Sequence, residues 1–351
     1  MGHSTASRYS APPEIPRCGA DGDRPLWSVM IPAHNRTALL AETLASVVVQ
    51  DQGERLMQIE VVDNSDDTRA VPQTVAECAG GRVSVFSQPT PVGMAENWNT
   101  CLAHARGELV HLLHDDDLVL PGFYQSIARA AATNPDVGAF FCRFSYIDEH
   151  NVETGLAPLV QASAGVLRNA VDVLGRSQQV QASAIVVRRV VYERLGGFRP
   201  DLNFAPDWEM WVRIACTFPV WYEPERLACY RLHGAADTAR VVRLGLDTAG
   251  SREAIKVFAE YLPAEYRRRV PRWARKDVAR RAVLLASRFA AQRDLVAAAR
   301  QLFQAVRTSR SPWIVVDLAR HIAAGVRGSL RRALFRAAKP VSARTTNQEH
   351  Q

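Results

Sequence analysis

Short apolar segments alternate with amphipathic segments from residue 27 onward, and this alternation limits the chain to few folds. Apolar runs with the length of a buried strand lie at residues 27–32, 59–63, 83–86, 109–113, 138–147 and 184–187. Apolar side chains recur at helical spacing in residues 37–50, 68–79, 94–105, 125–135 and 207–215. Strands that alternate with helices predict an α/β fold, in which a mostly parallel sheet carries helices on both faces.

The two ends of the chain differ in composition from this central part. Residues 1–24 are rich in Pro, Gly and Ser, which predicts a disordered N-terminal segment. Residues 241–351 carry 23 basic and 8 acidic side chains, whereas residues 1–240 carry 20 and 28. This basic region shows helical spacing at residues 250–260, 264–290, 292–307 and 312–338. We therefore predict three parts: residues 1–24, an α/β domain over 25–240, and a basic helical region over 241–351.

The basic region has two interpretations. In the first, its arginines form the solvated face of a helical cap. In the second, they contact an anionic membrane surface, and the apolar residues Ile314, Leu330 and Phe335 that lie among the arginines favour this contact. Nucleic acid is not expected as a partner because no recognition motif accompanies the charge.

Cysteine use and hydropathy bear on the location of the protein. Its six cysteines lack the paired spacing of a zinc site or a disulfide framework. No apolar run approaches the roughly 18 to 20 residues needed to span a bilayer. We expect a cytoplasmic protein, with the inner face of the cell membrane as a second location if the basic region binds lipid.

Polar residues follow three of the predicted strands. Residues 32–36 follow the first, Asp63 ends the second, and the fourth leads into Asp115, Asp116 and Asp117. Because parallel strands end at one edge of a sheet, these groups are expected to meet at a ligand site. Three adjacent carboxylates repel one another, and bound Mg²⁺ or Mn²⁺ would turn that repulsion into oxygen ligation. A carboxylate such as Asp63 can accept hydrogen bonds from a nucleotide base or ribose.

Taken together, these segments resemble the family-2 glycosyltransferases of the GT-A fold over roughly residues 26–235. The matching segments are Ile31-Pro32-Ala33-His34-Asn35-Arg36, Val61-Val62-Asp63, His114-Asp115-Asp116-Asp117, Gly196-Gly197-Phe198 with Asp207-Trp208-Glu209, and Tyr230-Arg231-Leu232-His233. The resemblance implies that Pro32, His34 and Arg36 line a nucleotide pocket and that Asp63 contacts the base. It also implies that the acidic cluster binds the diphosphate through a metal ion. In that arrangement Asp115 belongs to the nucleotide-binding residues, and Asp116, Asp117 and His233 bind the metal.

Two departures from the family pattern affect the expected site. The family usually has Glu-Asp where this chain has Pro206-Asp207, so Asp207 is left as the implied general base. The Asp-x-Asp metal motif fits two frames, His114-Asp115-Asp116 or Asp115-Asp116-Asp117, and the sequence leaves both open.

The resemblance implies a metal-dependent, inverting glycosyltransferase that moves a sugar from a nucleoside-diphosphate donor to a hydroxyl of a saccharide or lipid-linked acceptor, in cell-envelope polysaccharide or glycan synthesis. Residues 150–180, which lack clear periodicity, are expected to face the acceptor. Two alternatives are a nucleotidyltransferase, which should have a Gly-rich phosphate loop after the first strand, and a non-catalytic protein of the same fold that binds nucleotide sugars. Residues 32–36 lack such a loop, and Asp207 and the acidic triplet are both present.

Overall fold

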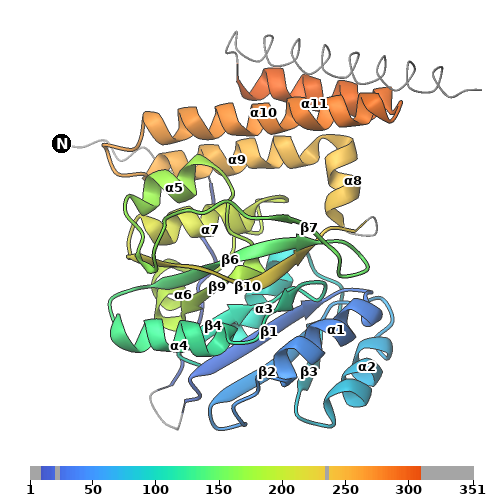
Figure 1. Cartoon of the computed structure of the whole chain (residues 1–351), viewed down its shortest axis with the longest axis vertical. Helices are drawn as coiled ribbons and strands as arrows, with labels where there is room; N and C mark the ends of the chain where they lie inside the picture. Colours follow the sequence, from blue (N-terminus) through green and yellow to red (C-terminus); the bar gives the residue numbers. More distant parts are fainter. Residues whose placement is uncertain (1–8, 20–23, 234–236, 310–351) are drawn as a thin grey trace, which may run out of the picture.

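The computed structural model describes residues 9–19, 24–233 and 237–309, and its centre is one mixed sheet of ten strands (Figure 1). The strands are β1 (Trp27–Ala33), β2 (Met57–Asp63), β3 (Ser84–Ser87), β4 (Leu109–Leu112), β5 (Leu118–Val119), β6 (Ala139–Ile147), β7 (Glu153–Leu156), β8 (Gly165–Val166), β9 (Ile185–Arg188) and β10 (Val220–Arg231). The helices are α1 (Thr37–Val48), α2 (Ala70–Ala79), α3 (Met94–His104), α4 (Phe123–Thr133), α5 (Ala170–Arg176), α6 (Arg189–Leu195), α7 (Pro206–Ala215), α8 (Asp237–Leu244), α9 (Leu246–Tyr261), α10 (Arg269–Ala291) and α11 (Leu295–Thr308).

The first half of the sheet is parallel and follows the predicted alternation. Strands β3, β2, β1 and β4 lie in that order, and their carboxyl ends share one edge. Side chains of β1 alternate between two cores: Val29 and Ile31 pack with α1, α2 and α4, whereas Met30 packs with α3, α6 and α7. Helices therefore cover both faces, and the predicted α/β class is confirmed.

The second half of the sheet is mixed, which the sequence did not predict. Strand β9 is antiparallel to both β4 and β6, while β6 and β10 are parallel to each other. The two-residue strand β5, which follows the acidic triplet, pairs with β10 in antiparallel orientation. This pairing brings the end of β10, with Arg231 and His233, beside the acidic triplet at the ligand edge of the sheet.

Helices α9, α10 and α11 run side by side over α5 and α7, and α8 stands across one end of α9 (Figure 1). The predicted helices over 250–260, 264–290 and 292–307 correspond to α9, α10 and α11, whereas α8 was not predicted. Trp208 and Val212 of α7 share a buried core with Ile255 and Phe258 of α9 and Val270 of α10. The predicted helix over 312–338, with its membrane-contacting side chains, lies outside the described residues, and the division of the chain at residue 240 stays a prediction. Among the described helices, none has the length and apolar character needed to cross a bilayer.

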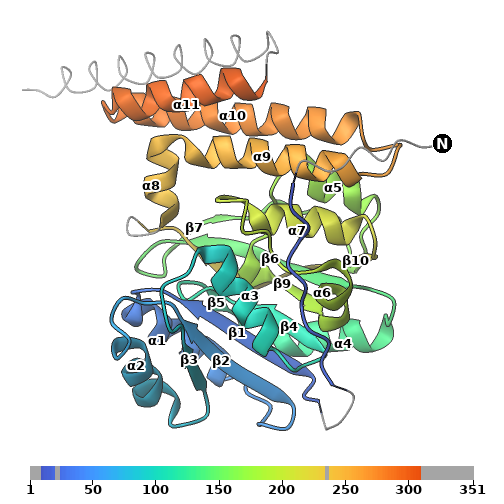
Figure 2. The same ribbon diagram turned by 180° about the vertical axis from the view of Figure 1, so that it is seen from behind.

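The expected N-terminal disorder does not extend over residues 9–19. Figure 2 shows this segment running along α6 and α7 on the back of the molecule. The Ile15 side chain is buried in the core beside α3, the backbone N–H of Gly197 donates to the Pro13 carbonyl at 2.7 Å, and Arg189 donates to the Pro16 carbonyl at 2.8 Å. Composition missed this order because isolated apolar residues between prolines can dock on a preformed surface without any regular secondary structure.

Candidate active site

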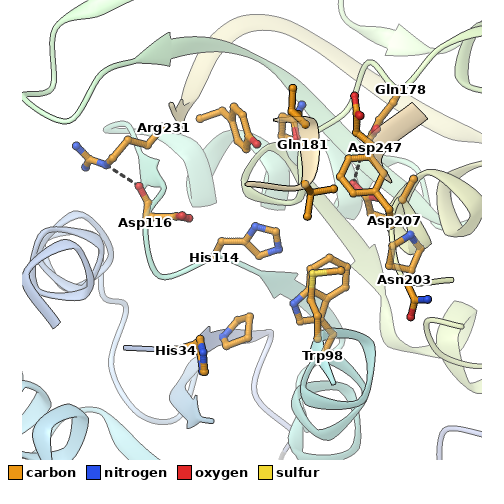
Figure 3. Close-up of a pocket in the computed structure, with 18 of the residues that line it drawn as sticks. His34, Trp98, His114, Asp116, Gln178, Gln181, Asn203, Asp207, Arg231 and Asp247 are labelled. Carbon is orange, nitrogen blue, oxygen red and sulfur yellow. Dashed lines mark hydrogen bonds between the residues drawn. The ribbon is translucent and has the colours of Figure 1, made fainter. Parts of the chain in front are cut away.

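A cavity of about 620 Å³ opens at the carboxyl ends of β1, β2 and β4. Its walls come from the loops after these strands, from α3, from the start of α7, and from α8, α9 and α10. Figure 3 shows the acidic turn with Arg231 at one side of this cavity and Asp207 with Gln178 at the other. The cavity therefore has room for a ligand that touches both groups.

The acidic triplet lies in a turn, so its side chains do not alternate as they would in a strand. Asp115 accepts a hydrogen bond from the His34 backbone N–H at 2.9 Å and lies 3.0 Å from the Arg36 guanidinium. Asp116 lies 2.9 Å from a second nitrogen of Arg36 and accepts from His233 Nε2 at 3.1 Å. The turn thus joins residues from three of the predicted motifs.

Arg231, at the end of β10, fixes the far side of the turn. Its backbone N–H donates to Asp117 Oδ1 at 2.9 Å, and its side-chain Nε donates to the Asp116 carbonyl at 2.7 Å. The guanidinium also pairs with Glu42 of α1 at 2.8 Å and is itself buried. Thr43 of α1 donates to the Asp117 carbonyl at 2.8 Å. This network holds the backbone of the turn on two elements far apart in sequence.

Three side chains of the turn are arranged as a possible metal site. His114, Asp116 and Asp117 each place one ligand atom within 4.8 Å of the others. This set belongs to neither Asp-x-Asp frame alone, because Asp115 points toward His34 and Arg36. The His114 ring stacks on Trp98 with 5.0 Å between ring centroids. Burial lowers the pKa of His114, which keeps the imidazole neutral and able to act as a ligand.

The pKa values in the turn indicate too little positive charge for three carboxylates. Burial raises the pKa of Asp115 to about 7 despite Arg36, and burial with the nearby Asp116 raises that of Asp117 well above its ordinary value. Burial also acts on Asp116, but the hydrogen bond from His233 and the charge of Arg36 bring its pKa below 3.8. A divalent cation would supply the missing charge, and carboxylate and imidazole ligands suit Mg²⁺ or Mn²⁺. The residues present therefore fit the expected metal.

The ends of β1 and β2 form the wall next to this turn. The His34 ring donates from Nδ1 to the Asn64 carbonyl at 2.7 Å, which joins the two strand ends. Pro32, His34, Arg36 and Asn64 line the cavity. Asp63 is buried beside the wall, and its carboxylate accepts from the Ser65 backbone N–H at 2.9 Å. The cavity wall at β2 is thus formed by Asn64, and the predicted contact of Asp63 with a base stays a prediction.

Asp207 lies at the start of α7 on the opposite side of the cavity. Pro206 occupies the first helical turn before it, where a missing backbone N–H costs nothing. The Gln178 amide donates to Asp207 Oδ2 at 2.7 Å. Burial raises the pKa of Asp207 to about 6. Hydrogen bonds from the Trp208 backbone N–H and from the Gln178 side-chain amide oppose this rise. A carboxylate with this pKa is ionised at neutral pH and more basic than an exposed aspartate.

Sequence reasoning missed several residues of the cavity. Residues 150–180 were expected to face the acceptor, and from this range Gln178 lines the cavity. Asp247 of α9 and Arg281 of α10 line it from the C-terminal helices, which were not expected to contribute. Arg231 was matched to the family pattern without a role. An arginine in a strand with buried neighbours was the available signal, since a buried guanidinium needs acceptors around it.

Together, the helix-covered mixed sheet and this two-sided cavity at its ligand edge define a glycosyltransferase with a GT-A fold. The chain belongs to glycosyl transferase family 2, whose family model matches residues 28–193. The resemblance drawn from the motifs is thereby confirmed.

Three known proteins place the chain among its relatives. It is 30% identical over 230 residues to the uncharacterized protein MT1568 of Mycobacterium tuberculosis, covering 62% of this chain and 71% of that one. The GalNAc(5)-diNAcBac-PP-undecaprenol beta-1,3-glucosyltransferase of Campylobacter jejuni is 32% identical over 108 residues, 30% of this chain and 35% of that protein. The structure of mannosyltransferase PcManGT from Pyrobaculum calidifontis, in complex with GDP-Man and Mn²⁺, superposes with a TM-score of 0.54 at 20% identity, covering 92% of this chain and 84% of that one. The last similarity concerns the fold.

Proposed function

We propose that this glycosyltransferase moves a sugar from a nucleoside-diphosphate donor to an acceptor hydroxyl, with a divalent cation and with inversion at the anomeric carbon. The observation that carries the proposal is the position of Asp207, a carboxylate with a pKa of about 6, across one cavity from a turn rich in carboxylates. The two groups suit the two ends of a displacement reaction: the leaving diphosphate and the attacking hydroxyl.

The donor would lie along the ends of β1, β2 and β4. Pro32, His34 and Arg36 line this part of the cavity, and Asp63 or its neighbour Asn64 would contact the nucleoside. When bound at Asp116, Asp117 and either His114 or His233, the cation would stabilise negative charge on the diphosphate. His233 donates to Asp116 in the present arrangement, so it would orient that carboxylate even without ligating metal.

Arg36 has a second role in the proposal. Its guanidinium pairs with Asp115 and Asp116, at 3.0 and 2.9 Å, and lines the cavity. A guanidinium that already faces the acidic turn can donate to a diphosphate oxygen when the donor arrives, because its fork of N–H groups suits phosphate geometry.

Asp207 would act as the general base. As the acceptor oxygen forms its bond to the anomeric carbon, the bond from that carbon to the diphosphate oxygen breaks, and the hydroxyl proton passes to Asp207. One direct displacement inverts the configuration. Gln178 would hold the carboxylate toward the cavity, because Asp207 can accept the hydrogen bond from the Gln178 amide whether it is ionised or protonated.

The acceptor class is supported by less direct observations. The Campylobacter relative is named for a lipid-linked acceptor, an undecaprenol diphosphate saccharide. The basic composition of residues 241–351 is consistent with a cytoplasmic enzyme that contacts the anionic inner face of the membrane. These points support a role in cell-envelope polysaccharide or glycan synthesis.

A thermal-shift screen of the purified protein tests the donor site first. UDP, GDP, dTDP and CDP are each added with and without Mn²⁺ or Mg²⁺. We expect one nucleotide to raise the melting temperature only when a cation is present, because binding to the native state stabilises it. The sugar nucleotide of that base is then used for transfer assays, and the anomeric configuration of the product is read by NMR. Absence of any shift with all four nucleotides, or a product with retained configuration, would contradict the proposal.

A further inference from the structure

The part of the cavity beyond Asp207, called the chamber below, is lined by residues of the C-terminal helices. Val242 of α8, Asp247 and Ser251 of α9, and Val278, Arg281 and Leu285 of α10 line this chamber. In Figure 3, Asp247 is drawn on the same side of the cavity as Asp207 and Gln178, away from the acidic turn. A ligand in this chamber would therefore meet the base from the side opposite the donor.

This wall is fixed relative to the base. Trp208, the residue after Asp207, packs edge-on against Phe258 of α9 at 5.4 Å between ring centroids. Tyr261 of α9 donates to the buried Glu209 carboxylate of α7 at 2.9 Å. Arg269, the first residue of α10, pairs with Asp172 of α5 at 2.6 Å. The helix that carries the base and the helices that line the chamber therefore form one packed unit.

The polar groups of the chamber suit sugar hydroxyls. Asp247 Oδ1 accepts a hydrogen bond from the Gln301 amide at 2.8 Å. The other carboxylate oxygen, Oδ2, is therefore the one that can accept hydrogen bonds from a ligand. Burial raises the pKa of Asp247, while hydrogen bonds from the Gln301 amide and the Thr248 backbone N–H and the charge of Arg281 oppose the rise. Asp247 and Arg281 both line the cavity. A carboxylate that accepts and a guanidinium that donates can together bind neighbouring hydroxyls, which do both.

The charge balance of the chamber disfavours an anionic ligand. Of the cavity-lining residues at the chamber end, away from the acidic turn, Asp207 and Asp247 carry carboxylates and Arg281 carries a guanidinium. Arg281 Nε also lies 3.2 Å from Asp277 of its own helix, which offsets its charge further. A phosphate or uronate in this chamber would meet net negative charge, whereas the C–H face of a neutral sugar ring can pack on Val242, Val278 and Leu285.

We propose that α9 and α10 form the acceptor subsite and that it takes a neutral saccharide, with hydroxyls bound by Asp247 and Arg281 and the attacking hydroxyl directed at Asp207. The inference rests on the proposed function, since it names the acceptor class for the same cavity. It also replaces residues 150–180 as the main acceptor-facing element with the C-terminal helices.

Saccharide binding can be tested without turnover. Saturation-transfer NMR on the full-length protein with Mn²⁺ replaced by Mg²⁺ compares the methyl glycosides of glucose, galactose, mannose and N-acetylglucosamine with methyl glucuronide and glucose 6-phosphate. We expect at least one neutral glycoside to bind and both anionic probes to bind more weakly. Asp247→Asn and Arg281→Gln should each weaken binding of the neutral glycoside about tenfold or more, because each removes a hydrogen bond to a charged group. The Asn side chain can still accept from Gln301, so this variant should fold.

Transfer assays distinguish an acceptor defect from failure of the donor site. With UDP-glucose, UDP-N-acetylglucosamine or GDP-mannose, we expect Asp247→Asn to raise the acceptor KM while slow hydrolysis of the donor in the absence of acceptor is unchanged. Glu253→Gln, at a half-exposed position of α9 outside the cavity lining, is the matched control and should behave as wild type. Absence of binding by every neutral glycoside, stronger binding of an anionic probe, or unchanged affinity in both variants would overturn the subsite. Absence of nucleotide binding and donor hydrolysis in the wild type would instead refute the proposed function.

Discussion

Replacing the proposed base by its amide should make the protein more stable. A carboxyl group whose pKa rises from 3.8 in the unfolded chain to about 6 on folding costs the folded state about 3 kcal/mol at neutral pH. Asp207→Asn keeps the shape of the side chain and removes the charge that burial disfavours. Its amide oxygen can still accept the hydrogen bond that Gln178 donates at 2.7 Å. The variant should therefore gain up to about 3 kcal/mol in free energy of unfolding at pH 7.5.

The sign of the pH dependence follows from proton binding. Between the two pKa values the folded protein binds more protons at Asp207 than the unfolded chain, so this group's contribution to stability falls as the pH rises through that window and is constant above it. The difference between variant and wild type should thus be close to zero below the unfolded pKa, about 1.5 kcal/mol at pH 5, and about 3 kcal/mol at pH 7.5.

Urea unfolding followed by tryptophan fluorescence measures this difference. Other carboxylates titrate in both proteins alike and cancel in the comparison. Asp136→Asn, at an exposed position, is the control and should match wild type at both pH values. A variant that is equally stable or less stable at pH 7.5, or a stability gain that does not shrink toward pH 5, would refute the reasoning. The same variant should bind the donor but lose turnover, and wild-type kcat should rise with pH around a midpoint near 6.

Other consequences of the structure can be measured independently. Asp116→Asn should abolish the cation-dependent thermal shift with nucleotide, because this carboxylate belongs to the candidate metal cluster; a shift of wild-type size would exclude it as a ligand. Glu209→Ala should lower the free energy of unfolding by about 3–5 kcal/mol, since it leaves Arg213 buried without its partner at 2.9 Å, and replacing both residues by leucine should cost less if the ion pair is the cause. Gly107→Ala should be destabilising by about 1–3 kcal/mol or more, because the new Cβ would lie 2.4 Å from a backbone carbon of β1. Gly19→Ala, which has open space around it, should be neutral in the same melting experiment.

The sequence predicted the elements of the fold better than their arrangement. Periodicity located β1, β2, β4 and the helices between them, because each buried strand is a continuous apolar run and each helix has one apolar stripe. It could not give the direction of β9, a four-residue run that reads alike in either orientation. The start of the helix predicted at residue 264 was also wrong: residues 264–268 form turns, and α10 begins at Arg269.

Some residues of the candidate site could likewise be predicted from the sequence, and others could not. The acidic turn and the loop after β1 could be predicted to meet because both follow neighbouring parallel strands, and topology alone brings such ends together. Asp207 came from the family resemblance. Gln178, Asp247 and Arg281 could not be predicted, because they reach the cavity through packing of α7 against α9, and nothing local marks them.

The N-terminal segment has a consequence for biosynthesis. The Cys18 backbone N–H donates to Glu193, a residue 175 positions further along the chain. At synthesis rates of about 5–20 residues per second, the docking surface for residues 9–19 leaves the ribosome roughly 10–35 s after the segment itself. Until then Ile15 lacks the part of its core that α6 and α7 supply. Residues 9–19 are therefore synthesised before the surface on which they dock, and they can reach their native position only after that surface has formed.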